Sequence, residues 1–337
     1  MSCDADLDRV IEVGVGADVL RASLDALHRQ LQRAGNAADQ QALRMLLLRA
    51  AGIARTRGIA VADDLVGLAM KDARWLVTPG ALEASSRLEG PIRVTLWDGP
   101  PVDAVVQAQL EALELPAGPD LEMKYRFTAL NSGSDGLDAT LAPTTWSSAH
   151  RFHMALQRDS AWASKLADGR WARPIPFGEQ LLPGIAVVHA IILTADRRVI
   201  AALRSRATSY APLHWSVSFE EQLSENDFGH DQDAFTAAAR RGFHEEFGAE
   251  VSTADVIPLA SVLQVDLLNL GVVMLVRPAV TAREIRDSWQ SAASDRWEAE
   301  DIQSIPLDDL ASENIGLQLH PTSQLRCLAL RRWLFSP

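Results

Sequence analysis

Residues 231–248 read DQDAFTAAARRGFHEEFG and decide the fold of the chain around them. Apolar side chains recur every four residues through this stretch, which is the spacing of one face of an α-helix, at positions Phe235, Ala239, Phe243 and Phe247. An aspartate at the start, Asp231 or Asp233, is suited to cap such a helix, and Gly248 is suited to end it. The stretch therefore predicts an amphipathic helix that packs against a core.

A second face of this helix carries charge. Glu245 and Glu246 lie three and four residues after Gly242, so the two carboxylates share a face with a position that has no side chain. Arg241 lies one turn before Glu245 and can orient it through a charge-assisted hydrogen bond. Taken alone, a glutamate pair on a helix is more often a solvated face than a site. Its neighbours in the sequence decide between the two interpretations.

In this register the stretch resembles the signature of the Nudix hydrolases, Gly-x5-Glu-x7-Arg-Glu-hydrophobic-x-Glu-Glu-x-Gly-hydrophobic. Arg241, the glutamate pair and the glycine after it match the second half. Asp227 stands where the first Gly of the signature belongs, and Asp233 stands where its early Glu belongs. Gly242 replaces the Glu that follows the Arg, so the box at residues 227–249 is degenerate.

The resemblance extends over about residues 184–310. Residues 193–205 look like the family's strand, turn and strand ending in Arg-Ser, and residues 296–310 look like its Glu-rich turn, last strand and the start of the last helix. Where the family has a pair of glycines, this chain has residues 219–222, FEEQ, followed by a polar insertion. The resemblance implies a Nudix-type α/β/α sandwich with a mixed sheet, an α/β fold, over residues 181–337.

The family's chemistry implies a function and a set of site residues. The resemblance implies metal-dependent hydrolysis of a pyrophosphate bond in a nucleoside diphosphate-linked substrate, with Mg²⁺ or Mn²⁺ held by clustered carboxylates. The implied catalytic residues are Glu245, Glu246, Arg241 and Glu300. The implied metal ligands are Glu245, Glu246, Glu298 and Glu221. Because position 242 lacks its Glu, either Glu220 or Glu221 has to compensate if the site is active.

Four further residues are candidates for substrate binding. Arg204 and Arg206 end a predicted strand and are suited to hold phosphate, since guanidinium matches phosphate oxygens in a bidentate way, although such arginines also form surface ion pairs. His214 and Trp215 are suited to line a base or sugar pocket, but Trp215 is equally suited to fill the core.

Two alternatives to the hydrolase stay open. The first is a catalytically impaired Nudix-like domain that binds a nucleotide or nucleotide-sugar as a sensor or holds a protein partner, which Gly242 and the missing glycine pair favour. The second is other phosphoryl or isomerase chemistry on the same fold, because a fold does not determine a reaction.

Outside this half the sequence is less informative. The 337 residues are enough for two or three domains. Helical spacing predicts a mainly helical region over residues 1–85, whose apolar helices are candidates for packing or for a homodimer contact. Residues 86–180 alternate between strand-like and helical patterns and predict a mixed α/β region that resembles no family. His150 and His153 have no acidic or cysteine partner nearby in the sequence, which favours a structural role.

Composition restricts the partners. With 44 acidic and 32 basic residues the formal net charge is −12, which argues against nucleic acid or an anionic membrane as the general partner. The small nucleotide-type ligand is what the resemblance to the Nudix hydrolases implies. The two cysteines are too few for a disulfide framework. The longest apolar run, residues 184–193, is too short to span a bilayer, and the N-terminus lacks the pattern of a secretory signal. The sequence therefore predicts a cytoplasmic protein.

Overall fold

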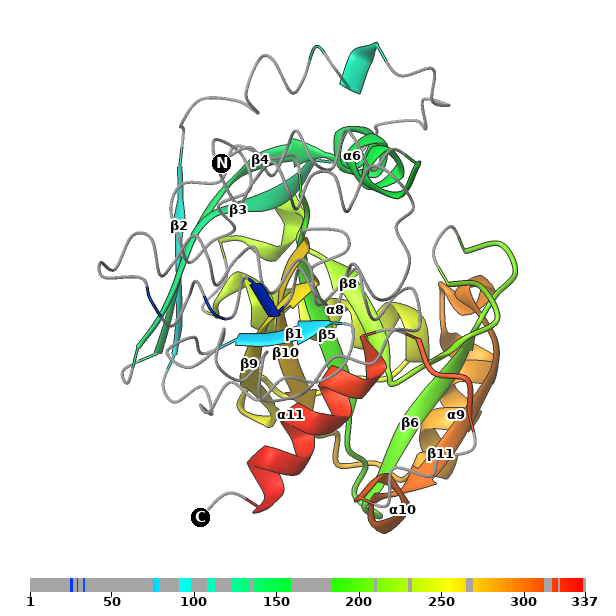
Figure 1. Ribbon diagram of the computed structural model, residues 1–337. Helices are drawn as coiled ribbons and strands as arrows, with labels where there is room; N and C mark the ends of the chain where they lie inside the picture. The colour runs from blue at the N-terminus through cyan, green and yellow to red at the C-terminus, as the bar shows by residue number, and fades with distance from the viewer. Residues whose placement is uncertain are drawn as a thin grey trace.

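The computed structural model describes residues 91–97, 123–133, 136–158, 184–208, 211–229, 232–264, 269–311, 317–320 and 322–335, together with strand 75–78 and single positions between 25 and 112. The elements within these ranges form three sheets, with helices packed on them (Figure 1).

A five-stranded mixed sheet lies at the centre of the C-terminal half (Figure 1). Its strands, in spatial order, are β1 (Trp75–Thr78), β9 (Val256–Gln264), β10 (Asn269–Val276), β5 (Ala186–Ile192) and β8 (Phe219–Gln222). Strand β10 runs parallel to β5 and antiparallel to β9, while β8 runs antiparallel to β5 at the edge. Every residue of β5 is buried, as its continuous apolar run predicts for a strand covered on both faces.

One helix covers each face of this sheet. Helix α8 (Ala234–Phe247) packs on β8, β5 and β10, and helix α11 (Ser323–Phe335) packs on β5 and β9. The predicted apolar stripe of α8 is fully covered, because its four members are at most 1% exposed. Separate core clusters fill the α8 side and the α11 side. The predicted α/β/α sandwich with a mixed sheet is confirmed for this half of the chain.

A smaller antiparallel sheet adjoins the central one. It consists of β11 (Ala299–Pro306), β6 (Arg198–Arg204) and β7 (Trp215–Ser216), and it is accompanied by α9 (Ala282–Ala292) and α10 (Leu307–Ala311). Three short 3₁₀ turns connect the elements: η1 (Glu225–Asp227), η2 (Thr253–Asp255) and η3 (Arg296–Glu298). The buried Ser218 hydroxyl joins the two sheets, since it accepts from the Ile192 amide at 3.0 Å and donates to the Ile200 carbonyl at 2.6 Å.

The third sheet belongs to the middle region. Strands β2 (Ile92–Leu96) and β3 (Met123–Gly133) flank β4 (Gly136–Thr145), and α6 (Trp146–Arg158) follows directly. The mixture of strands and helix agrees with the expected mixed character. Phe127 of β3 stacks on Phe235 of α8 with ring centroids 5.7 Å apart, so this sheet contributes to the same core as α8. The boundaries at residues 85 and 180 stay predictions.

The predicted helical region 1–85 lies mostly outside the described residues. One correction falls within it: Trp75–Thr78, inside the region predicted to be helical, forms β1 and pairs in parallel with β9. Its sequence, WLVT, is rich in the aromatic and β-branched residues that favour strands. Among the helices of the described ranges, none has the length and apolar character needed to cross a bilayer.

Candidate functional site

Helix α8 begins and ends at the predicted residues. The Asp233 carboxylate caps it, because one oxygen accepts from the amides of Phe235 and Thr236 at 3.0 Å each. Gly248 ends the helix with a φ of 66°, and its amide donates to the His244 carbonyl at 2.8 Å. A Cβ at this position would lie 2.8 Å from the Ala292 backbone, so both the conformation and the space require glycine.

Arg241 holds the charged face of α8 in place. Its Nε and one terminal nitrogen each donate to the Asp227 carboxylate at 2.9 Å, and Asp227 is 1% exposed. The other terminal nitrogen donates to Glu245 at 3.0 Å and forms an ion pair with Glu221 at 3.1 Å. Burial alone would lower the pKa of Arg241, but these carboxylates outweigh it and raise the pKa above its ordinary value. The predicted interaction of Arg241 with Glu245 is present, together with two partners from outside the helix.

Gly242 faces the side chain of Glu221. A Cβ built on Gly242 would lie 3.0 Å from a carboxylate oxygen of Glu221 and 2.7 Å from the ring of Phe219, both on β8. The carboxylate of Glu221 therefore occupies the space next to the helix where the Nudix signature has a glutamate. Burial raises the pKa of Glu221 to about 7, with Arg241 acting against the shift and Glu245 acting with it. Of the two residues expected to compensate, Glu221 is the one on this face.

Glu246 lies at the centre of a group of coupled carboxylates. Burial raises the pKa of Glu246 well above its ordinary value, and the negative charges of Glu298 and Glu221 raise it further. Burial likewise raises the pKa of Glu298, and Asp295 adds to that shift. Arg204 is close enough to oppose the shift in both Glu246 and Glu298. The structure thus brings Glu246 of α8 and Glu298 of η3 close to Arg204, and Glu221 of β8 close to Glu246.

The remaining candidates are Glu300, His214 and Trp215, and each has partners of its own. Glu300 is exposed, and its carboxylate accepts from the Arg206 amide at 3.2 Å. His214 bonds to the Pro212 carbonyl at 2.9 Å and to the Gln318 side chain at 3.0 Å. Trp215 packs against the core cluster on the α11 side, which favours the packing interpretation for this residue.

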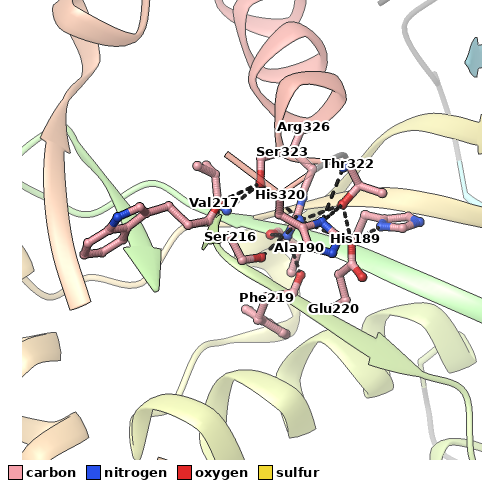
Figure 2. A network of polar contacts seen from close by, with 11 residues as sticks. His189, Ala190, Ser216, Val217, Phe219, Glu220, His320, Thr322, Ser323 and Arg326 are labelled. Atoms are coloured by element: carbon pink, nitrogen blue, oxygen red, sulfur yellow. Dashed lines mark hydrogen bonds and ion pairs between the residues drawn. The ribbon is translucent and has the colours of Figure 1, made fainter. Parts of the chain in front are cut away.

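A second polar network lies on the opposite face of β8 (Figure 2). Glu220 pairs in register with His189 of β5, whose Nδ1 lies 3.0 Å from the carboxylate. Arg326 of α11, which is 0% exposed, forms an ion pair with the same carboxylate at 3.2 Å, and the Thr322 hydroxyl donates to it. Burial opposes ionisation, but His320, His189 and Arg326 hold the pKa of Glu220 well below its ordinary value. Glu220 is therefore committed to α11 and is turned away from Glu246.

Comparisons with known proteins give matches among solved structures alone. No protein-family model matches the chain, and no curated protein does. Similar solved structures include a MutT protein from Methanosarcina mazei Go1, with 11% identity and a TM-score of 0.31 over 46% of this chain and 97% of that one. A MutT/Nudix family protein from Enterococcus faecalis has 13% identity and a TM-score of 0.32 over 54% and 73%. The Nudix domain of Shewanella oneidensis NrtR complexed with ADP-ribose has 12% identity and a TM-score of 0.31 over 45% and 88%.

These neighbours are Nudix proteins. The likeness covers part of the chain, and the chemistry of the site has to be judged on the residues of this chain. Carboxylate oxygens from three elements are the donors that Mg²⁺ or Mn²⁺ requires, and their mutual repulsion is what a divalent cation would relieve. In the part of the chain that the structure describes, however, no three acidic, histidine or cysteine side chains are gathered tightly enough to hold a metal ion. The donor chemistry fits a cation, whereas the side chains are not arranged around one.

Sequence reasoning missed the network around Glu220. Its contacts join residues that lie 106 and 136 positions apart along the chain, so no local motif indicates it. A weak signal was present, because His189 interrupts the apolar run of β5 and Arg326 interrupts the apolar helix α11. A charged residue inside a buried element needs a partner from elsewhere in the fold.

Proposed function

We propose that residues 184–310 form a Nudix-like active site that hydrolyses a pyrophosphate bond in a nucleoside diphosphate-linked substrate, with Mg²⁺ or Mn²⁺ as cofactor. The observation that carries the proposal is the position of Glu221, whose carboxylate fills the space beside Gly242. The glutamate missing from the helix is thereby replaced by one from the neighbouring strand.

Three residues would hold the cation: Glu221, Glu246 and Glu298. When bound, the cation neutralises phosphate charge and makes a water molecule acidic enough to attack phosphorus. Arg204, which already lies near Glu246 and Glu298, would bind a phosphate oxygen and stabilise the charge that develops during transfer. Arg206 would add a second cation at the edge of the site.

Three glutamates have roles in proton transfer, in orientation and at the edge of the site. Glu246, which lies near Glu298 and Glu221, would accept a proton from the attacking water. Glu245 is held by Arg241 and would fix the guanidinium opposite Glu221. Glu300, exposed beside Arg206, would contact the leaving group or solvent.

A product-release assay tests the proposal. Purified protein with Mg²⁺ or Mn²⁺ is offered nucleoside triphosphates, dinucleoside polyphosphates, NAD-type dinucleotides, sugar nucleotides and ADP-ribose. Wild type is expected to turn over at least one class, and Glu246→Gln is expected to lose about 100-fold or more of that rate. Glu250→Gln is the matched control, because Glu250 is 73% exposed and pairs only with His244 among the ion pairs of the described residues. Activity that survives Glu246→Gln would refute the assignment.

The second candidate function is a catalytically impaired domain that binds a nucleotide or nucleotide-sugar as a sensor. It is favoured because the carboxylates of the described residues are not arranged around a metal site and because Gly242 replaces a glutamate of the Nudix signature. Melting curves separate the two candidates, because a ligand that binds only the folded state stabilises by about 2.7 kcal/mol at 100 times its Kd. The sensor predicts a shift with nucleotide alone and no turnover, whereas the enzyme predicts a shift that requires Mg²⁺ or Mn²⁺.

A further inference from the structure

Trp297, in the turn η3, is a large aromatic side chain that the fold leaves in solvent. It is 60% exposed, the most of the large hydrophobic residues in the described ranges. Trp289, eight residues earlier on α9, is 5% exposed and belongs to the core. Single exposed hydrophobic residues are common on protein surfaces, so the surroundings of Trp297 have to show whether it serves a ligand.

The turn that carries Trp297 is held from two sides. The Asp295 amide donates to the Glu245 carbonyl of α8 at 2.9 Å, which fixes the start of the turn. At its end, the Glu298 carbonyl accepts from the Ser205 amide, directly after β6, at 2.7 Å. Trp297 is therefore presented to solvent by an ordered turn, and a ring that is already positioned loses little conformational freedom when a ligand binds.

Trp297 lies at the end of β6 that carries Arg204. In the antiparallel pairing of β11 with β6, Ala299 stands opposite Arg204, and Trp297 comes two residues before Ala299. On the β7 side of the same strand, the Leu213 amide donates to the Arg204 carbonyl at 3.0 Å. Leu213 is 43% exposed and has a φ of 59°, a conformation that residues other than glycine rarely adopt. Two exposed hydrophobic residues thus flank the strand end at Arg204.

We infer that Trp297 is a specificity-determining residue that stacks on the base of a nucleotide whose phosphate is bound by Arg204. The inference rests on the proposed function and names the group that the site recognises. An indole offers a flat π face to an aromatic ring, and a guanidinium offers donors to phosphate oxygens. A sugar phosphate would use Arg204 but not that face. Stacking needs no metal ion, so the inference applies to the hydrolase and to the sensor alike.

AMP and ribose 5-phosphate test the inference, because they share sugar and phosphate and differ in the base. Their Kd values are measured by NMR titration of the ligand signals with EDTA present. Wild type is expected to bind AMP at least about 5-fold more tightly than ribose 5-phosphate. Trp297→Ala should weaken AMP binding by about 5- to 100-fold, the usual effect of removing a stacked aromatic side chain. It should leave the Kd of ribose 5-phosphate within twofold, and Trp297→Phe should keep most of the preference for AMP.

Leu96→Ala is the matched control, because Leu96 is 52% exposed and belongs to β2 of the third sheet. It should change neither Kd by more than twofold. An unchanged AMP Kd in Trp297→Ala, or equal losses for both ligands, would overturn the inference, since equal losses mean that Trp297 only supports the turn. Wild type that binds no AMP, with EDTA or with Mg²⁺, would also overturn it. The product-release assay judges hydrolysis separately: a protein that prefers AMP through Trp297 but hydrolyses no substrate keeps the inference and loses the enzyme.

Discussion

At position 242 the helix and the neighbouring strand compete for one small volume. The Phe219 ring and the Glu221 carboxylate reach to within 2.7 and 3.0 Å of where a Cβ would stand, and Phe219 is only 1% exposed. A glycine in the middle of a helix costs about 1 kcal/mol relative to alanine. The close approach of β8 is the physical reason for that cost here.

Gly242→Ala should therefore destabilise the protein despite the better helix propensity of alanine. Overpacking a core costs about 1–3 kcal/mol and alanine regains about 1 kcal/mol of helix propensity, so we expect a net loss of up to about 2 kcal/mol in urea unfolding. His244→Ala, at an exposed position of the same helix, is the control and should change the free energy of unfolding by less than about 0.5 kcal/mol. A Gly242→Ala protein more stable than wild type would show that β8 does not approach as described.

At the scale of elements, Arg326 fastens α11 to the central sheet. One of its terminal nitrogens donates to the Phe219 carbonyl at 2.8 Å, and the other bonds Ser216 at 3.1 Å and Glu220 at 3.2 Å (Figure 2). Arg326 thus joins α11 to Ser216 of β7, to the backbone of β8 at Phe219 and to the side chain of Glu220 in β8. Breaking one partner of a buried ion pair is costly because the other charge stays behind.

Arg326→Met should lower the free energy of unfolding by about 3–5 kcal/mol, because Glu220 then keeps a buried charge without the guanidinium that pairs with it. Adding Glu220→Gln removes that charge, so the double variant should regain part of the loss. Urea unfolding of the wild type, both single variants and the double variant completes the cycle. Strictly additive losses would contradict a direct coupling between the two side chains.

Elements with local patterns could be predicted from the sequence. The apolar stripe, Asp233 and Gly248 identified α8, and the apolar β-branched run identified β5. The departure at Gly242 was visible too, but its compensation was not, because the sequence does not show which of Glu220 and Glu221 faces the helix. That choice depends on how β8 pairs with β5, and pairing joins residues far apart in the chain. The same reason hid the network of Arg326.

At the scale of the whole molecule, buried titratable groups are distributed over several layers and act in opposite directions. Burial lowers the pKa of His320, beside α11, to about 3, and it lowers the pKa of His153, on α6, to about 4. Glu221, on the α8 side, has its pKa raised to about 7. Each pKa unit corresponds to about 1.4 kcal/mol of stability.

The buried histidines should contribute a loss of stability in acid. A histidine with a lowered pKa binds fewer protons in the folded state, so its contribution to stability is lost as the pH falls below about 6.5. Glu221 has the opposite sign, because its raised pKa costs stability as the pH rises from about 4.5 to 7. Glu246 and Glu298, whose pKa values are also raised, act in the same direction as Glu221, so the test compares wild type with His153→Gln in urea unfolding at pH 7, 6, 5 and 4. His153→Gln should flatten this dependence, and an unchanged slope would refute the assignment for His153.

Strand β8 gives adjacent glutamates different tasks. Glu220 faces α11 and Glu221 faces α8, since successive side chains of a strand point to opposite faces. The position of a carboxylate along β8 therefore decides whether it joins the buried network around Arg326 or the charged face of α8. A shift of one residue in the pairing of β8 with β5 would exchange the two glutamates between these faces.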